Sequence, residues 1–329
     1  MKRTRAMIVS ILLVALVLFT GCGSAKDDTS TRIGSLKGPT SLGLLNLMEN
    51  VEASSLESPD KAVFEFTTEG TADALTGPFI NGDLDIILVP ANVASILYNK
   101  TGGEVVALDI NTLGVLYILS SDASIQSIQD LSGRTIVMTG KGTTPDYVLQ
   151  YLLAANGMST SDVTLEFKSE ATEVTAYLQE NPDCVALLPQ PYVTTVLMQN
   201  PEMAINLDLT KEWDKTQTDK PSKSRLITGV TIVRKAFLNE HPQAIERFVT
   251  AHLDSVNYAL NNPDIAAHLA VEYGIIPKEE VALAALPYCN ICCITGSELK
   301  DALSGYLSAL YELDPSSIGG SLPGDDFYY

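Results

Sequence analysis

Short apolar runs alternate along this chain with longer segments in which apolar residues recur at helical spacing. Residues 84–89 (LDIILV) form a continuous apolar run, typical of a strand buried on both faces, and residues 42–48 place leucines and a methionine on a helical face. Up to residue 119 the predicted order is β-α-β-α-β-α-β. The alternation restarts with a strand at residues 135–138 and continues to residue 207. Two α/β series in succession predict two lobes, each with a largely parallel sheet flanked by helices.

The last part of the chain sets the boundaries between the two predicted lobes. Residues 226–233 are β-rich, and after them the pattern predicts only helices, which we expect to pack on the sheet of the first lobe. The chain then crosses between the lobes twice, near residues 113–121 and 225–230. Such a two-lobe α/β fold with two hinge crossings has a cleft between the carboxyl ends of its strands, where a ligand binds and the lobes close. The domain assignment is residues 32–112 and 229–329 for lobe 1, and residues 113–228 for lobe 2.

The first residues have the features of an export signal. Basic residues precede residues 6–19, which are uncharged, mostly apolar and too short to span a bilayer. Small residues directly before Cys22 resemble the bacterial lipobox, where cleavage leaves a lipid-modified cysteine. We predict a signal peptide over residues 1–21, lipid attachment at Cys22, and a flexible tether over residues 22–31 that holds the protein at the outer face of the cell membrane. The alternative is an ordinary signal peptide before an unmodified cysteine.

Composition and charge exclude several classes of partner. The chain has 329 residues, with 21 Lys plus Arg against 40 Asp plus Glu and a formal net charge of −19. Such a surface repels nucleic acid and anionic lipid, so we expect no nucleic-acid partner and membrane contact only through the lipid anchor. An exported chain also lacks cytosolic ATP, NADH and pyridoxal phosphate. We therefore expect no cofactor and no enzymatic activity.

A series of short motifs, in this order and spacing, resembles the solute-binding proteins of ABC importers, in the branch that includes thiamine-precursor, sulfonate and nitrate binders. The resemblance implies the type II periplasmic-binding-protein fold, capture of a small solute outside the cytoplasm, delivery to a permease and an ATPase, and a monomeric state. The motifs are residues 37–40 (KGPT), 89–92 (VPAN), 99–103 (NKTGG), 110–115 (INTLGV), 130–134 (DLSGR), 139–147, 188–192 (LPQPY) and 317–329 (SIGGSLPGDDFYY).

The first candidate binding loop joins a predicted strand to a helix. Lys37, Gly38, Pro39 and Thr40 precede the helix N-terminus, where free backbone N–H groups favour an acceptor or an anion. The alternative is that Thr40 or Ser41 only caps this helix.

A second glycine-rich loop follows the strand at residues 135–138. Gly140, Thr143, Thr144 and Tyr147 are its candidate ligand contacts, and the loop lacks the Gly-Lys-Ser/Thr ending of a nucleotide-binding P-loop. A nucleotide ligand is therefore not expected.

The remaining candidate contacts are polar residues at strand ends and at the crossings. Gln190 offers donors and an acceptor and Tyr192 a stacking face, although Tyr192 in packing and Asn92 as a helix cap are equally good interpretations. The candidates of this group are Pro90, Asn92, Asn111, Thr112, Gln190, Tyr192 and Asn290.

These loops suggest a polar, mostly neutral pocket. Tyr117, Tyr147 and Tyr192 could stack on a ring, and Asp146 or Asn111 could bind an amino group, so the favoured solute is a thiamine-precursor pyrimidine or a similar heteroaromatic. A small oxyanion such as a sulfonate or nitrate is the alternative. A sensor or scaffold lipoprotein without transport is the alternative of another class. The predicted rim charges are Lys37, Lys141 and Arg225 against Glu69 and Asp146.

Four cysteines follow Cys22: Cys184, Cys289, Cys292 and Cys293. The close spacing of the last three is compatible with a metal or redox site, but no second cysteine pair and no histidine at ligand spacing accompanies them. We therefore predict that they pack in the core or form one disulfide, and that the chain has no metal site.

Overall fold

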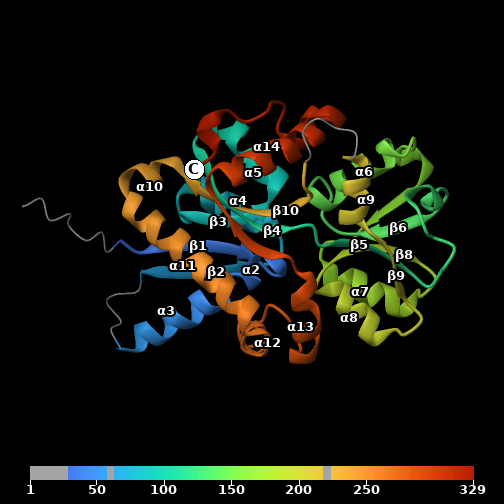
Figure 1. Cartoon of the computed structure of the whole chain (residues 1–329), viewed down its shortest axis with the longest axis horizontal. Coiled ribbons are helices and arrows are strands. Elements are labelled where there is room, and N and C mark those ends of the chain that lie inside the picture. Colours follow the sequence, from blue (N-terminus) through green and yellow to red (C-terminus); the bar gives the residue numbers. More distant parts are fainter. Residues whose placement is uncertain (1–28, 58–62, 218–223) are drawn as a thin grey trace, which may run out of the picture.

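The computed structural model describes residues 29–57, 63–217 and 224–329. Within these ranges the strands form two sheets, each flanked by helices, and the two resulting bodies lie side by side in Figure 1. We keep the names lobe 1 and lobe 2 for the first and the second sheet with the helices packed on them. The predicted signal peptide, the lipid attachment at Cys22 and most of the predicted tether lie outside the described residues.

Lobe 1 is built on a sheet with the strand order β11-β4-β10-β3-β1-β2. β1 pairs in parallel with β2 and β3, whereas β10 lies between β3 and β4 and runs antiparallel to both. The strands are β1 (Thr31–Leu36), β2 (Phe64–Glu69), β3 (Ile86–Pro90), β4 (Val105–Leu113), β10 (Ile227–Arg234) and β11 (Ile291–Ile294). The helices are α2 (Pro39–Leu42), α3 (Leu45–Glu57), α4 (Ala72–Asn81), α5 (Ala91–Thr101), α10 (Lys235–Glu240), α11 (Pro242–Asn261), α12 (Pro263–Glu272), α13 (Glu279–Ala285) and α14 (Gly296–Leu313).

Successive residues of β3 belong to separate apolar layers. Ile86 and Leu88 pack in a cluster with residues of α3, α10 and α11, and Ile87 and Val89 pack in another with residues of α4, α5 and α14. Side chains of a strand point alternately to its two faces, so helices cover both faces here. This explains why residues 84–89 are apolar at nearly every position.

Lobe 2 is built on a sheet with the strand order β7-β6-β8-β5-β9, in which β5 is antiparallel to both neighbours. The strands are β5 (Leu116–Ser120), β6 (Thr135–Met138), β7 (Thr164–Phe167), β8 (Val185–Pro189) and β9 (Ala204–Asp208). The helices are α6 (Thr144–Ala155), α7 (Ala171–Glu180), α8 (Tyr192–Gln199) and α9 (Leu209–Thr216). Across the described residues, no helix has the length and apolar character that crossing a membrane requires.

The α/β fold class, with two sheets flanked by helices, is confirmed. Both sheets are mixed, because β5 enters lobe 2 from lobe 1 and β10 returns from lobe 2, and each runs against its neighbours. The sequence analysis missed β11 and α9. α9 (LTKEWDKT) buries only Leu209 and Trp213, one helical turn apart, which is too little apolar periodicity to stand out. The residue boundaries of the lobes remain a prediction.

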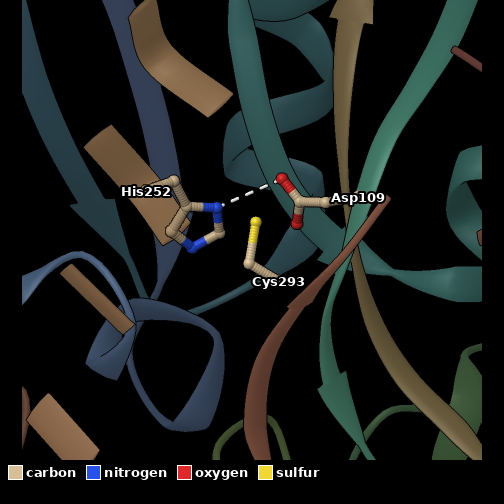
Figure 2. A group of neighbouring side chains, drawn as sticks. All are labelled: Asp109, His252 and Cys293. Carbon is tan, nitrogen blue, oxygen red and sulfur yellow. Dashed lines mark hydrogen bonds and ion pairs between the residues drawn. The ribbon is translucent and has the colours of Figure 1, made fainter. Parts of the chain in front are cut away.

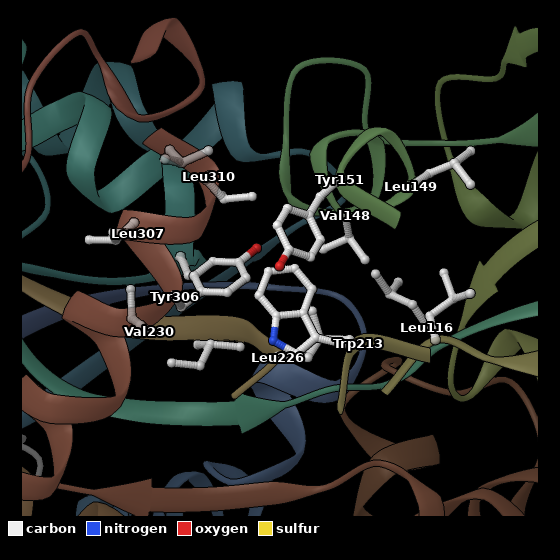
Figure 3. Packing of buried hydrophobic residues seen from close by; sticks show 14 of the residues in the cluster. Leu116, Val148, Leu149, Tyr151, Trp213, Leu226, Val230, Tyr306, Leu307 and Leu310 are labelled. Atoms are coloured by element: carbon white, nitrogen blue, oxygen red, sulfur yellow. The ribbon is translucent and has the colours of Figure 1, made fainter. Parts of the chain in front are cut away.

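The C-terminal helix α14 corrects one expectation. We expected the last helices to pack on lobe 1, but α14 also packs against α6 of lobe 2. Figure 3 shows the shared core: the fully buried Trp213 ring lies 4.3 Å from the ring of Tyr151 and 5.4 Å from that of Tyr306, measured between ring centroids. A continuous apolar core therefore joins the two lobes.

The residues after α14 fold back onto lobe 1. Phe327 is fully buried and its ring packs edge-on against Tyr98, with centroids 5.1 Å apart. The backbone N–H of Tyr329 donates to the carbonyl of Ala107 at 3.0 Å, and Asp326 pairs with Lys235 at 2.8 Å. This tail is thus part of the folded body.

The first crossing between the lobes passes through Gly114, between β4 and β5. A Cβ on Gly114 would lie 2.1 Å from Thr210 Oγ1 and 3.0 Å from Leu226 Cδ2, so the position has no room for a side chain. The Asn290 side-chain amide donates to the Gly114 carbonyl at 2.6 Å, and the Leu113 N–H donates to the Asn290 carbonyl at 3.1 Å. Gly114 is therefore enclosed by lobe 2, by the second crossing and by the segment before β11.

We predict that Gly114→Ala lowers the free energy of unfolding by about 1–3 kcal/mol, because the added methyl group overpacks this junction. Gly77→Ala is the matched control, since nothing lies within 4 Å of a Cβ at that helical position. The control should leave stability unchanged or raise it by up to about 1 kcal/mol. Urea unfolding followed by circular dichroism measures both; equal stability of the two variants contradicts the account.

Asp85, just before β3, is an acid held between two arginines. Arg32 Nε and Nη2 donate to its carboxylate at 2.9 and 2.7 Å, and Arg234 donates to the same group. Burial alone would raise the pKa of the Asp85 carboxyl, but the hydrogen bonds from Arg32 and Arg234 outweigh it and lower this pKa below its ordinary value.

A lowered folded-state pKa means that the Asp85 contribution to stability is present above the unfolded pKa of about 4 and is lost as the pH falls through the folded value. We predict that Asp85→Asn is less stable than the unsubstituted chain at pH 7 by about 1.5–3 kcal/mol. The difference should shrink between pH 5 and pH 2, values that bracket about 4. Urea unfolding across this range measures it; a pH-independent difference argues against the ion pair.

Candidate functional site

A cleft of about 980 Å³ lies between the lobes. Its lining comes from the loops that follow β1, β2 and β3 in lobe 1 and from those that follow β6, β7 and β8 in lobe 2. These are the carboxyl ends of parallel strands, where backbone groups and loop side chains are open to a ligand. The position of the cleft is the one expected from the sequence.

The structure places about half of the predicted site residues in the cleft lining. Gly38 lies between two of them but does not itself line the cleft. Whether any of these residues contacts a ligand remains a prediction. The predicted residues in the lining are Lys37, Pro39, Thr40, Pro90, Gly140, Thr143, Thr144 and Tyr192.

The turn from β1 into α2 depends on Gly38. Its φ of 133° and ψ of −153° lie in a region open to glycine, and it is the N-cap residue of α2, without a capping side chain. The Thr40 hydroxyl instead donates back to the Leu36 carbonyl at 3.1 Å, as does that of Ser41 at 2.5 Å. The capping role considered for Thr40 or Ser41 is therefore not seen, and Thr40 is held at the cleft wall.

The loop after β6 is shaped by internal hydrogen bonds. The Thr143 hydroxyl donates to the Gly140 carbonyl at 2.7 Å, and the Gly142 N–H donates to Asp146 Oδ2 at 2.8 Å. Asp146 also accepts a bond from Gln150 at 2.7 Å and is buried. Asp146 thus holds the loop in place. The sequence analysis suggested that Asp146 binds an amino group of the solute, but its carboxylate already accepts hydrogen bonds from Gly142 and Gln150.

Asn92 lies outside the cleft lining and connects three parts of the chain. Its side-chain amide donates to the Gly142 carbonyl at 3.2 Å and to the Ser317 carbonyl at 3.1 Å, and its Oδ1 accepts from the Thr144 hydroxyl at 3.4 Å. The side chain is completely buried. Asn92 therefore ties α5 of lobe 1 to the glycine-rich loop of lobe 2 and to the C-terminal tail.

Gln190 is buried beside the start of α8. Its Oε1 accepts from the Thr194 hydroxyl at 2.8 Å and from the Thr194 N–H at 3.3 Å, and its own N–H donates to the Val115 carbonyl. The peptide bond to Pro191 is cis. Gln190 therefore does not line the cleft, while the next aromatic residue, Tyr192, does.

The other predicted contacts also lie away from the lining. Asn111 and Thr112 are buried in β4, where the Thr112 hydroxyl donates to Asn111 Oδ1 at 2.9 Å and the Asn111 amide donates to Thr231 at 3.2 Å. Asn290 holds the crossing at Gly114, as described above. Tyr147 is half-buried, and burial raises the pKa of its phenol.

Three lining loops were missed by the sequence analysis: those after β2 and β7, and the loop between α12 and α13. The first two contribute Gly70, Thr71 and Asp73 from lobe 1 and Lys168 and Glu170 from lobe 2. A Cβ on Gly70 would lie 2.6 Å from Glu170 Oε1, so the two lobes meet at this point of the cleft. The sequence contained a signal for the loops after β2 and β7. Both directly follow predicted strands, as do the loops that the sequence analysis chose as candidate binding loops.

The charges of the lining differ from the expected ones. Arg225 pairs with Glu298 at 3.1 Å and does not line the cleft, and Glu69 is also absent from the lining. Four lysines stand against two acids, a balance of plus two on a chain of net charge −19. The rim of the cleft is therefore locally positive. The lining charges are Lys37, Lys100, Lys141 and Lys168 against Asp73 and Glu170.

The neutral part of the lining is hydroxyl-rich, with an apolar wall. Among the described residues that line the cleft, Tyr192 is the sole aromatic, and burial raises the pKa of its phenol. Tyr117 and Tyr147, the other stacking candidates, are absent from the lining. The apolar wall is formed by Leu36, Ile80, Val93, Ile96, Leu97 and Leu116. The arrangement can hold an organic solute by packing, hydroxyl hydrogen bonds and lysine charge.

The four cysteines that the structure describes are free thiols. The disulfide considered from the sequence is therefore not formed. Cys289 is buried among residues of α12 and α13, and burial raises the pKa of its thiol to about 12. None of the four lines the cleft, as far as the described lining goes.

Comparison with known proteins supports the same architecture. The family model described as "NMT1/THI5 like" matches residues 104–266. An ABC transporter protein from Parabacteroides distasonis is 22% identical, with a TM-score of 0.72 over 92% of this chain and 99% of that one. The periplasmic aliphatic sulphonate binding protein SsuA from Escherichia coli is 14% identical, with a TM-score of 0.69 over 91% and 92%. The chain has the type II periplasmic-binding-protein fold. The resemblance drawn from the sequence motifs is thus confirmed.

A sequence relative adds a partial likeness. Riboflavin-binding protein RibY from Chloroflexus aurantiacus is 25% identical over 170 residues, a match that covers 51% of this chain and 43% of that protein. The aligned region thus spans less than half of the relative.

We predict that Asn92→Ala lowers the free energy of unfolding by about 1–3 kcal/mol, because it leaves buried carbonyl groups without their donor. Asn99→Ala is the matched control: Asn99 also donates to the tail, to the Ile318 and Ser321 carbonyls, and among the described residues its side-chain hydrogen bonds do not reach lobe 2. Both variants should lose stability in urea. Only Asn92→Ala should increase the radius of gyration measured by small-angle scattering; equal effects on the radius contradict the interlobe role.

Proposed function

We propose that this protein is the extracytoplasmic solute-binding component of an ABC importer. In this proposal it captures a small molecule in the cleft between the lobes and delivers it to a permease and an ATPase. The observation that carries the proposal is the 980 Å³ cleft, lined by the strand-end loops of both sheets. The names of the similar structures, which refer to an ABC transporter and to a sulphonate-binding protein, support it.

Ligand-driven closure follows from this lining. A solute that contacts only one lobe cannot favour the closed state, because a ligand shifts an equilibrium only by its difference in affinity for the two states. Here Thr40 of lobe 1 and Thr143 of lobe 2 both line the cleft, so one solute can bridge them. Closure then removes water and strengthens the hydrogen bonds to the solute.

The first solute class that we propose is a heteroaromatic small molecule, such as a thiamine-precursor pyrimidine. Tyr192 supplies the ring face for stacking, and the apolar wall supplies further contact. The cleft volume lies near the upper end of the range of about 300–1,000 Å³ for drug-sized ligands, more than a nitrate ion needs. The name of the relative, riboflavin-binding protein RibY, refers to a heteroaromatic solute.

A second solute class, an organic anion such as a sulfonate, is favoured by a separate observation. The four lysines of the lining outnumber its two acids, and the likeness to a sulphonate-binding structure points the same way. Lys37, Lys100 and Lys141 are exposed, so they interact with a charged group through a partly solvated contact, whereas Lys168 is partly buried and pairs with Glu166 at 2.7 Å.

Membrane attachment through lipidated Cys22 and a monomeric state are part of the same proposal. A sensor or scaffold with the same cleft is the competing role. The two roles differ in one outcome: deletion of the gene abolishes uptake of the bound solute only if the protein feeds a transporter. The absence of an uptake defect favours the sensor or scaffold.

We predict that one of the two solute classes raises the melting temperature of the protein and reduces its radius of gyration. The measurement is a thermal-shift screen of pyrimidines, flavins and alkanesulfonates. Small-angle scattering and calorimetry follow with the solutes that raise the melting temperature. If no compound changes either property, capture by closure is wrong.

Variants distinguish the two classes. Tyr192→Ala should weaken binding of a heteroaromatic at least fivefold, about 1 kcal/mol, whereas Tyr192→Phe keeps the ring and the affinity. Lys100→Gln with Lys141→Gln should weaken an organic anion selectively. Tyr288→Ala and Lys278→Gln, both outside the cleft lining, are the matched controls. Losses that are equal in the cleft variants and the controls contradict the assignment of the cleft as the binding site.

A further inference from the structure

A cluster of polar side chains lies in lobe 1, outside the cleft lining. Asp109 of β4, His252 of α11 and Cys293 of β11 come from distant parts of the sequence, and Figure 2 shows their side chains pointing toward one another. Each offers one metal-ligand atom, and these atoms all lie within 4.8 Å of one another. Asp109 and His252 are completely buried, and Cys293 is partly buried.

The cluster places polar groups in an apolar core. His252 Nδ1 lies 3.1 Å from Asp109 Oδ2, and the Thr231 hydroxyl donates to Asp109 Oδ1 at 2.7 Å. The buried His252 Nε2 has no hydrogen-bond partner among the described groups, and this cost of about 1–3 kcal/mol remains when a metal binds at Nδ1. Asp109 also stands between Leu108 and Ile110, in a strand whose other buried positions are mostly apolar.

A catalytic thiol is a poor interpretation of this cluster. Burial, and then the neighbouring carboxylate of Asp109, raise the pKa of the Cys293 thiol, so the nucleophilic thiolate is suppressed. The cluster also stands apart from the residues that line the cleft, where a substrate would bind.

We propose that Asp109, His252 and Cys293 bind a single zinc ion. Sulfur, imidazole nitrogen and carboxylate oxygen are the donors that zinc takes in proteins, and a tetrahedral site places its ligand atoms about 3.5 Å apart. The three ligand atoms lie within 4.8 Å of one another, so they must approach by up to about 1.3 Å to reach that spacing, and a water molecule would supply the fourth ligand. The sequence analysis considered a metal site at the cysteine cluster that includes Cys293 and predicted none, because no histidine lies at ligand spacing; His252 is more than 40 positions away.

Charge balance favours zinc in this buried place. Binding releases the thiol proton to solvent, while the proton on Nδ1 moves to Nε2 and the imidazole remains neutral. The two positive charges of the ion are then balanced by one carboxylate and one thiolate, which avoids an uncompensated buried charge. Partly buried Cys293 marks the side from which an ion reaches the site.

The site would fasten α11 and the edge strand β11 to the neighbouring strand β4. The same segment contains Asn290, whose side chain holds the Gly114 carbonyl at the first crossing. Zinc is therefore expected to stabilise lobe 1 next to the hinge without entering the solute cleft.

The test is a cobalt and zinc titration of the reduced full chain, purified in detergent and freed of metal. One equivalent of Co²⁺ should give a thiolate-to-cobalt charge-transfer band in the near ultraviolet together with visible bands of tetrahedral cobalt, and Zn²⁺ should displace it. Cys293→Ser should lose the charge-transfer band and bind zinc at least tenfold more weakly in competition with a chelator.

Cys292→Ser is the matched control. The Cys292 thiol donates to the Ile110 carbonyl at 3.2 Å and packs with a different apolar cluster from Cys293. Cys184→Ser, in lobe 2, is a second control, and both should keep the band and the affinity. If the unsubstituted chain shows no thiolate band, or if Cys293→Ser binds zinc as tightly as the controls, the site does not exist. A missing thiolate band in the unsubstituted chain rules out the site even when Cys293→Ser fails to fold.

Discussion

The relation between the two lobes depends on the packing around one residue that has no side chain. At Gly114 the chain leaves the sheet of lobe 1 and enters that of lobe 2, and Thr210, Leu226 and Asn290 close around it. Because these residues belong to lobe 2, to the second crossing and to the segment before β11, the junction fixes the crossings relative to each other. A hinge with such close contacts bends at few positions, which keeps the strand-end loops of both lobes facing one cleft.

Around this junction, the lobes share more than two crossing strands. The rings of Tyr151, Trp213 and Tyr306 form an apolar core that belongs to both lobes, and Asn92 adds buried hydrogen bonds between them. Apolar packing is non-directional, whereas hydrogen bonds require alignment. A small rotation of one lobe can therefore slide over the aromatic contacts, but it must break the bonds of Asn92. These bonds are thus one directional contribution to the interlobe contact among the described residues.

Most of the fold could be predicted from the sequence, because strands such as residues 84–89 are apolar at nearly every position and their spacing follows the α/β pattern. It identified the loops that line the cleft better than the side chains in them. Tyr192 and Asn92 both begin helices after a strand, yet Tyr192 lines the cleft and Asn92 is buried in hydrogen bonds to Gly142 and Ser317. That difference arises from contacts with residues 50 and 225 positions away. The pattern of apolar and polar residues near Asn92 in the sequence contains no information on such distant hydrogen-bond partners.

The electrostatics of the cleft show why net charge alone misleads about a binding site. The chain carries −19 overall, which favours solubility, but the lysines of the lining gather at the place where the lobes meet. Charges beyond about 10 Å are screened at moderate salt, so a solute at the rim is influenced mainly by these lysines and by Asp73 and Glu170. In the proposed closure the lysines lose water, and a negative group on the solute offsets the cost of that desolvation. A neutral ring gains nothing from this attraction between the lysines and a negative group. Its binding must depend on contact with Tyr192 and with the apolar wall.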